Sequence, residues 1–297
     1  MSVSAGDSHV VCLRADGTVY AVGWNGYDQC EVAEWENIVA VSAGAGHTVG
    51  LREDGTVLAV GWNEYGQCEV AAWRDMIAVS AGAGHTLGLR RDGTVLAVGN
   101  NEADQCRVSD WRDIVAISAG DSHSVGLRAD GTVLAAGSKE DSRCDLADWK
   151  NIVEVSAGTF HTLGLKADGT VLAAGDNGDG QCEVGGWRGV VSISAGGYHS
   201  VGLKADGRLL AAGQNDEAQC ELDNWRLFQN IGDFEAQRKA LSVYSLARRR
   251  EESEELGREK NLLLAEYEKL NGLFTAKRRR EIEERLAQIE EELKRLG

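Results

Sequence analysis

The chain has 297 residues, a formal net charge of −16, 43% hydrophobic residues, 37 glycines and no proline. This composition is sufficient for a packed core and excludes a low-complexity disordered chain. No run of about 18 apolar residues is present, and the N-terminus lacks the basic and apolar regions of a signal peptide. We therefore expect a soluble, cytoplasmic protein with no membrane contact, although Met1 falls inside a repeat and an N-terminal truncation would hide a targeting segment.

A unit of 38 residues occurs six times without insertion or deletion. Its histidines are His9, His47, His85, His123, His161 and His199. The tryptophans that keep this step are Trp35, Trp73, Trp111, Trp149, Trp187 and Trp225. Cysteine keeps the same step at Cys30, Cys68, Cys106, Cys144, Cys182 and Cys220. A fixed period of this length indicates an architecture in which each repeat forms one structural unit.

Each repeat predicts four short antiparallel strands, which we describe for the second copy. Residues 38–43 form the first strand, and residues 47–52 alternate with the period of two that marks the second. Asp54-Gly55 predicts a two-residue type I′ turn, followed by a third strand over residues 56–60 and a fourth around residues 68–70. Four strands in roughly 40 residues are typical of an all-β propeller blade.

The repeats carry the pattern SAGxxHT, LxxDGTVLAxG, NxxGQC and a following tryptophan, over residues 2 to about 225. This pattern resembles the regulator of chromosome condensation repeat family in its compact bacterial form. The resemblance implies a β-propeller, and that family usually builds seven blades, whereas residues 226–297 contain no seventh copy. We expect a six-bladed ring over residues 1–225; a truncated seven-bladed ring, or an incomplete ring completed by another chain, is the alternative.

Residues 226–297 predict an α-helical hairpin or short coiled-coil tail. Asp233 can cap a first helix, and Asn271-Gly272 can end the second. The apolar positions of the three helical segments are Phe234, Leu241 and Tyr244, then Leu263, Tyr267 and Leu270, then Ile282, Leu286, Ile289, Leu293 and Leu296. The tail would serve self-association or the docking of a second protein.

Charge is distributed unevenly between the two parts. Residues 1–225 hold 32 acidic and 15 basic residues, a net charge of −17, whereas residues 226–297 have a net charge of +1. An acidic propeller repels phosphate backbones, so we expect no nucleic acid contact by the propeller. The basic run at residues 277–280 is followed by glutamates four positions on, as in a solvated helix face.

The repeated histidines and cysteines are predicted to be structural. Zinc sites place ligand pairs two to four residues apart, whereas His47 and Cys68 are separated by 21 positions. We expect free, buried thiols, and histidines and tryptophans packed between blades, with a histidine nitrogen bonded to backbone. A ring of histidines that binds a metal or an anion is the alternative. We find no nucleophile elbow, phosphate loop or acid–base pair, and we expect no catalytic residue, metal, cofactor or enzyme activity.

The six copies differ mainly at two places, the dipeptide before the histidine and the loop after the third strand. Alternating strand directions place both on one face, opposite the Asp-Gly turns. The candidate partner-binding residues there are Trp24, Tyr27, Trp62, Tyr65, Phe160, Tyr198, Asp7 and Asp121. Closure of the ring would join the aromatic residues of blades 6, 1 and 2 into one arc. The alternative is that Trp24 and Trp62 merely cover the base of their loops.

Aromatic side chains with an acidic surround favour a basic or amphipathic protein or peptide as partner, through burial and cation–π contacts. We therefore predict a non-catalytic protein-interaction module. The family resemblance implies a second possibility, a guanine-nucleotide exchange factor for a small GTPase, although no inserted loop stands out from the repeats. A carbohydrate-binding lectin is the third.

Overall fold

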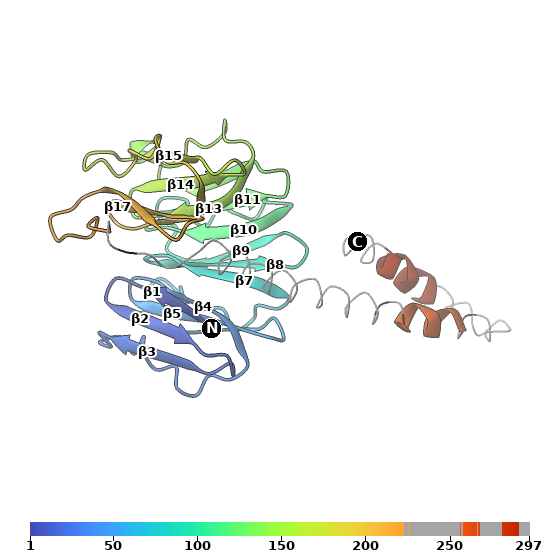
Figure 1. Ribbon diagram of the computed structural model, residues 1–297. Helices are drawn as coiled ribbons and strands as arrows, with labels where there is room; N and C mark the ends of the chain where they lie inside the picture. Colours follow the sequence, from blue (N-terminus) through green and yellow to red (C-terminus); the bar gives the residue numbers. More distant parts are fainter. Residues whose placement is uncertain (223–224, 226–255, 257, 266, 268–280, 291–297) are drawn as a thin grey trace. The chain divides into compact units, whose positions relative to one another are not determined.

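The computed structural model describes residues 1–222, 225, 256, 258–265, 267 and 281–290 (Figure 1). The chain divides into two compact units, Met1–Leu227 and Phe228–Gly297. Across the described residues, no helix has the length and apolar character needed to cross a membrane.

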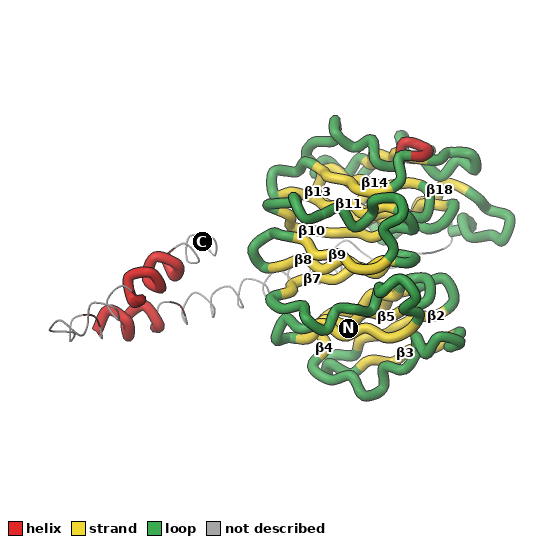
Figure 2. Tube along the Cα trace, turned by 180° about the vertical axis from the view of Figure 1, so that it is seen from behind, coloured by secondary structure: helices red, strands yellow, loops and turns green. Residues whose placement is uncertain are grey.

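The first unit is a β-propeller of six antiparallel sheets, which confirms the predicted fold class and number of blades. Figures 1 and 2 show the sheets following one another along the chain. The strands of blades 1 to 6 are β1 (Ser2–Ala5), β2 (His9–Leu13) and β3 (Val19–Gly23); β4 (Ile38–Ala43), β5 (His47–Arg52) and β6 (Val57–Gly61); β7 (Met76–Ala81), β8 (His85–Arg90) and β9 (Val95–Gly99); β10 (Ile114–Ala119), β11 (His123–Arg128) and β12 (Val133–Gly137); β13 (Ile152–Ala157), β14 (His161–Lys166) and β15 (Val171–Gly175); β16 (Val190–Ala195), β17 (His199–Lys204) and β18 (Leu209–Gly213).

Each blade is a meander of three strands, and the prediction of a fourth strand was wrong. In blade 2 the segment around Cys68 makes local hydrogen bonds instead of pairing with β6. The Cys68 N–H donates to the Asn63 side chain at 2.8 Å, and the Val70 N–H donates to the Cys68 carbonyl at 2.8 Å. Because these short-range bonds use the backbone donors, the segment stays a chain of turns.

The Asp-Gly turns also differ from the predicted type I′. Gly55 has a φ of +77°, but Asp54 is not among the residues with positive φ. The Gly55 N–H donates to the Arg52 carbonyl at 3.0 Å, and the Arg52 N–H donates to the Thr56 carbonyl at 2.9 Å. This is the three-residue loop in which a type I turn precedes a left-handed glycine. The Asp54 carboxylate accepts from both the N–H and the hydroxyl of Thr56, which fixes the turn.

Neighbouring blades are joined by a buried histidine. His47 Nε2 lies 2.9 Å from the Thr86 hydroxyl of the next blade, and that hydroxyl donates to the Gln67 carbonyl at 2.7 Å. Since the hydroxyl has only one proton to donate, it accepts from an Nε2–H of the imidazole. The histidine therefore bonds to a side chain and not, as expected, to backbone. The same bond links His9 to Thr48, His85 to Ser124, His123 to Thr162 and His161 to Ser200.

We call the contact between two neighbouring blades a joint. A tryptophan also contributes to each joint. A Cβ atom added to Gly88 would lie 2.4 Å from Trp73, so the ring of one blade fits directly on the glycine of the next. Five buried clusters result, each with a tryptophan that is at most 8% exposed. Within the described residues, no sixth cluster joins blade 6 to blade 1, and Trp225 is 59% exposed. Among the described residues, the contacts that would close the expected ring are therefore absent.

The second unit has helical residues at 256, 258–265, 267 and 281–290. Ile282 and Ile289 are fully buried, and Lys260 forms an ion pair with Glu290 at 2.8 Å. Arg285 bonds to Glu259 at 2.9 Å, so the two helices pack as the predicted hairpin. Outside the described residues lie the helix expected from Asp233, with Phe234, Leu241 and Tyr244, and also Leu270, Asn271-Gly272, Leu293, Leu296 and the basic run 277–280.

The joint predicts that Gly88→Ala destabilises the propeller by about 1–3 kcal/mol, because the added methyl group overlaps Trp73. Gly186→Ala is the matched control, since a Cβ there meets nothing within 4 Å. Urea unfolding followed by circular dichroism measures both. Equal stabilities of the two variants would contradict the packing described for the joint.

The histidines also make stability depend on pH. Burial lowers the pKa of His47, His85 and His161 to about 4 and that of His123 to about 3. Neighbouring ionisable groups make smaller contributions for His47, His123 and His161. A histidine in the unfolded chain has a pKa near 6.5, so the unfolded state binds more protons below that pH. Their contribution is fully present above about pH 7 and is lost as the pH falls toward 4.

We expect the free energy of unfolding to fall between pH 7 and pH 5 by up to about 1.4 kcal/mol per pH unit for each of these histidines. Urea titrations at several pH values measure the slope. His123→Gln should have a shallower slope than the parent chain, because one titrating group is removed. A stability that is unchanged from pH 7 to pH 5 would show that these rings are not buried in the neutral form.

Candidate functional site

The two variable segments of every blade lie together on one face, which we call the loop face. In each blade the residue that follows the third strand donates its N–H to the carbonyl of the residue before the histidine. In blade 2 the Trp62 N–H donates to the Gly46 carbonyl at 2.8 Å, and in blade 6 the Gln214 N–H donates to the Tyr198 carbonyl at 2.9 Å. The Asp-Gly turns lie at the opposite ends of the strands.

Four aromatic side chains of blades 1 and 2 contact one another in sequence, and we call them the aromatic ladder. Trp24 and Tyr27 meet edge to face at 4.9 Å between ring centroids, Tyr27 stacks on Trp62 at 6.1 Å, and Trp62 meets Tyr65 edge to face at 5.2 Å. Trp24, Tyr27 and Tyr65 are each about half exposed. The ladder therefore offers a continuous apolar surface that is already ordered.

Small residues and amide side chains position the ladder. A Cβ atom on Gly46 would lie 3.4 Å from the Tyr27 ring, an ordinary van der Waals distance, so this ring packs beside the backbone of blade 2. The buried Gln29 side chain accepts from the Tyr27 N–H at 3.0 Å, and Gln67 accepts from the Tyr65 N–H at 3.1 Å. The ladder residues thus belong to loops that are hydrogen-bonded at their base.

Phe160 and Tyr198, from blades 5 and 6, form a second group at 5.2 Å between ring centroids. Arg143 covers the Phe160 ring at 5.2 Å and donates to the Thr159 carbonyl at 2.9 Å and to Asp141 at 2.8 Å. Among the described residues, no ring contact joins this group to the ladder. The expected single arc is therefore two separate groups, because the arc depended on closure of the ring.

Sequence reasoning did not single out Arg143, which is only 2% exposed. A comparison of the six copies at this position of the repeat could have identified it. Gln29, Gln67, Gln105, Gln181 and Gln219 precede the repeated cysteine in the other five copies, and only the fourth copy has an arginine there. The substitution brings a cation to the joint between blades 4 and 5, where it holds Phe160.

Asp7 and Asp121 are the two acidic candidates of the dipeptide positions. Burial raises the pKa of the Asp121 carboxyl, the Arg143 guanidinium opposes this shift, and the charge of Asp7 adds to it. The carboxylates of blades 1 and 4 thus interact electrostatically. A cationic side chain placed near both would relieve the repulsion between them.

The repeated cysteines are free and partly buried. Cys106 Sγ lies 3.2 Å from the Asn100 carbonyl, and burial raises the pKa of this thiol to about 11. A thiol with such a pKa is a poor nucleophile and a poor metal ligand at neutral pH. Within the described residues, no group of three or more His, Cys, Asp or Glu side chains is arranged to hold a metal ion.

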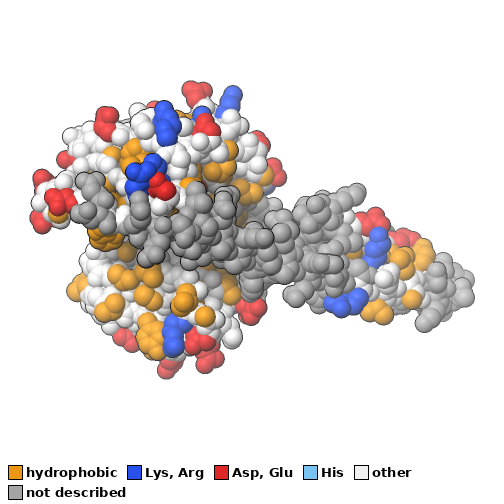
Figure 3. Space-filling model, in the orientation of Figure 1, with side chains coloured by type: hydrophobic (Ala, Val, Ile, Leu, Met, Phe, Trp, Pro, Cys, Tyr) orange, Lys and Arg blue, Asp and Glu red, His pale blue; other side chains and the backbone are white. Residues whose placement is uncertain are grey.

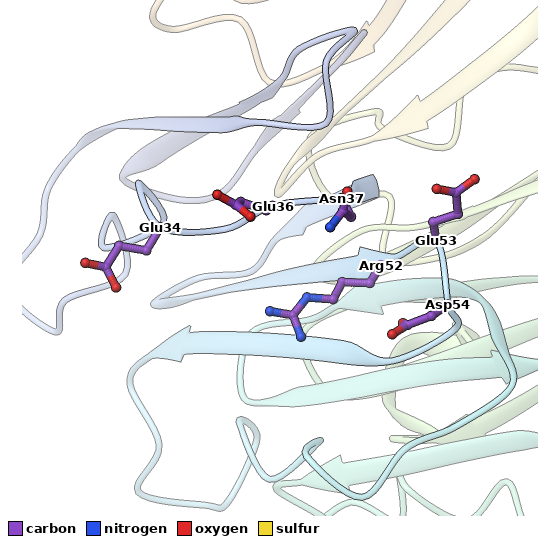
Figure 4. Close-up of a pocket in the computed structure, with 6 residues that line it drawn as sticks. All are labelled: Glu34, Glu36, Asn37, Arg52, Glu53 and Asp54. Carbon is purple, nitrogen blue, oxygen red and sulfur yellow. The ribbon is translucent and has the colours of Figure 1, made fainter.

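A shallow pocket lies on the opposite side of the propeller, beside the Asp-Gly turn of blade 2 (Figure 4). Its lining residues are Glu34, Glu36, Asn37, Arg52, Glu53 and Asp54. These side chains come from the first two blades and are all polar. The lining contains no serine, threonine, cysteine or histidine, so it offers no nucleophile paired with a base.

The comparisons with known proteins agree with the six repeats. The family model described as the regulator of chromosome condensation (RCC1) repeat matches residues 2–29, 38–67, 76–105, 114–142, 152–181 and 190–219. The chain belongs to the RCC1 repeat family. Compared with the curated proteins, it matches none.

Solved propellers of this kind share the fold of the RCC1-repeat unit at low sequence identity. Prp20p from Saccharomyces cerevisiae is 18% identical with a TM-score of 0.62, covering 76% of this chain and 74% of that one. Human WBSCR16 is 16% identical with a TM-score of 0.62, covering 76% and 79%. The ectodomain of the receptor kinase ACR4 from Arabidopsis thaliana is 22% identical with a TM-score of 0.60, covering 71% and 83%. At these identities, the likenesses show that the fold is shared.

Proposed function

We propose that this RCC1-repeat protein is a non-catalytic interaction module that binds a basic or amphipathic protein or peptide on its loop face. The observation that carries the proposal is the aromatic ladder, which is ordered by its own contacts and half exposed. Rigid aromatic side chains lose little entropy on binding and are the residues that most often dominate the affinity of an interface.

Charge supports a cationic partner. Residues 1–225 have a net charge of −17, which attracts basic proteins and increases their rate of association. The faces of Trp24 and Tyr65 can each hold a lysine or arginine side chain by cation–π contact, worth about 0.5–2 kcal/mol. Asp7 and Asp121 are the carboxylates proposed to pair with a further cation.

The helical tail is proposed to assemble copies of the chain or to dock a second protein. Support comes from Leu262 and Leu264, which are 72% and 42% exposed on the outside of the hairpin. Exposed leucines on a short two-helix unit are apolar area that a partner helix can cover.

The double variant Trp24→Ala/Tyr65→Ala is expected to lose its partner with little change in stability, because both side chains are about half exposed. Trp62 is left intact because it lies inside the ladder and packs against Gly84. The test is capture of proteins from the source cell by the immobilised chain, quantified by mass spectrometry. Wild type should enrich basic proteins that salt releases, and the double variant should not.

The matched control is Val153→Ala, which shortens an apolar side chain that is 54% exposed in β13 of blade 5, outside the loop face. It should capture the same proteins as the wild type. Equal enrichment by the double variant and the wild type would place the binding surface elsewhere and contradict the proposal.

A second candidate is guanine-nucleotide exchange on a small GTPase. The structure of Prp20p is published with its binding to Gsp1p and histones, and its propeller has the same fold. Against this candidate, the six described repeats have the same strand pattern without insertions. Within them, the one helical segment is the short turn η1 (Glu140–Ser142), seen as a red segment in Figure 2. Most of the η1 loop contacts serve to hold Arg143.

Release of a fluorescent guanine nucleotide from purified small GTPases of the source organism tests this second candidate. We expect no acceleration, because the described part of the repeats contains no inserted loop that could open a nucleotide site. Acceleration that Trp24→Ala/Tyr65→Ala leaves unchanged would favour exchange over the interaction module.

A further inference from the structure

We define the outer face of blade 6 as the face bearing Ser194, His199 and Trp225. This face has the groups that join one blade to the next, but no other blade contacts it within the described residues. In blades 1 to 5 the equivalent serine accepts from a backbone N–H of the following blade, as Ser156 does from Ala195 at 2.9 Å. The equivalent histidine bonds to a hydroxyl, and the equivalent tryptophan covers a glycine. Within the described residues, Ser194, His199 and Trp225 lack these counterparts.

The axial glycines show the same asymmetry. A Cβ atom added to Gly158 would lie 2.4 Å from the Gly196 carbonyl oxygen of the next blade, and the four preceding glycines of the series meet the next carbonyl in the same way. Gly196 meets only its own His199. The series of contacts from blade to blade therefore stops at blade 6.

Blade 1 lacks the hydroxyl residue and the glycine that the other blades present to the preceding blade. Every receiving strand carries a hydroxyl residue, any residue and then glycine, as in Thr48-Val49-Gly50. The corresponding residues of β2 are Val10, Val11 and Cys12. Val10 has no hydroxyl to accept from a histidine, and the side chain of Cys12 occupies the space that a tryptophan needs.

Blade 1 instead presents an apolar outer face. Val3, Tyr20 and Val22 are 60–70% exposed, and their register with Val10 and Cys12 places all five on one side of the sheet. Figure 3 shows apolar side chains gathered on the surface around β1 to β3. The equivalent residues of blade 2, Val41, Leu58 and Val60, pack against the cluster of blade 1.

We propose that the outer face of blade 6 is a docking site for a β-hairpin of a partner protein whose strand carries serine or threonine, any residue, then glycine. The hydroxyl would accept from His199 Nε2–H and donate to the Gln219 carbonyl, as in the five joints described. Trp225 would cover the glycine. The opposite side of the partner hairpin would lie toward Val3 and Val22 of blade 1. We expect no tryptophan on that side of the hairpin, because Cys12 of blade 1 leaves no room for one.

This chain does not supply that strand itself. In residues 226–297 no serine or threonine stands two positions before a glycine. A second copy is no better, because its receiving strands are occupied in its own joints and its free blade 1 has Val10 and Cys12. The chemistry therefore favours a different chain with a repeat-like hairpin.

The experiment uses the full chain and a fluorescein-labelled peptide of residues 38–61, which carries β4 to β6 with Thr48 and Gly50. The matched control peptide has Thr48→Val and Gly50→Cys, the residues of blade 1. Fluorescence anisotropy should show binding of the first peptide and binding at least about tenfold weaker for the second, since the second lacks the hydroxyl for His199 and places a side chain where Trp225 would lie.

In the chain, Trp225→Ala should weaken the binding of the first peptide by a similar factor, whereas Trp24→Ala on the loop face should not. Trp225 is exposed, so its removal leaves the fold intact. Absence of binding, or equal binding of the two peptides, overturns the proposal. Light scattering that shows a dimer undisturbed by the peptide also overturns it, in favour of self-association through this face.

Discussion

Each blade of this propeller depends on the hydrogen bond from a buried histidine to a hydroxyl of the next blade. The hydroxyl donates its proton to a glutamine or arginine carbonyl, so the histidine must donate from Nε2. Burial lowers the pKa of the ring and so favours its neutral form at neutral pH. This arrangement fixes the distance between neighbouring sheets. The tryptophan then fits on a glycine, because no side chain stands between the ring and the backbone. Stability is in this way carried by nearest-neighbour joints, as in other repeat proteins.

The joint has a direction, and its two ends are chemically different. A blade contributes histidine and tryptophan to one neighbour and offers hydroxyl and glycine to the other. The burial of each tryptophan is worth about 5 kcal/mol of hydrophobic free energy, which Trp225 largely forgoes at 59% exposure. Blade 6 keeps the contributing residues, whereas Val10 and Cys12 remove the receiving ones from blade 1. The residues of both terminal blades therefore disfavour a joint between blade 6 and blade 1.

The candidate site depends on the same joint. Tyr27 belongs to blade 1 and stacks on Trp62 of blade 2, so the ladder exists only because His9 and Trp35 hold these two blades in register. The aromatic residues could be found from the sequence, because they stand where the copies differ. Their stacking could not, since it depends on the distance between blades. Arg143 was missed for a similar reason, because its contacts lie in the following blade.

The sequence by itself determined the period, the six blades, the order of strands and the face on which variable residues gather, because these follow from local alternation and turn chemistry. It also determined the helical hairpin, whose apolar spacing requires a partner helix. Only the tertiary structure decided the number of strands per blade, the form of the Asp-Gly turns and the absence, among the described residues, of contacts that would close the ring. Each of these features depends on whether hydrogen bonds and packing within one blade are more favourable than those between blades. Those free energies depend on groups that are distant in the chain, so no single repeat contains the information.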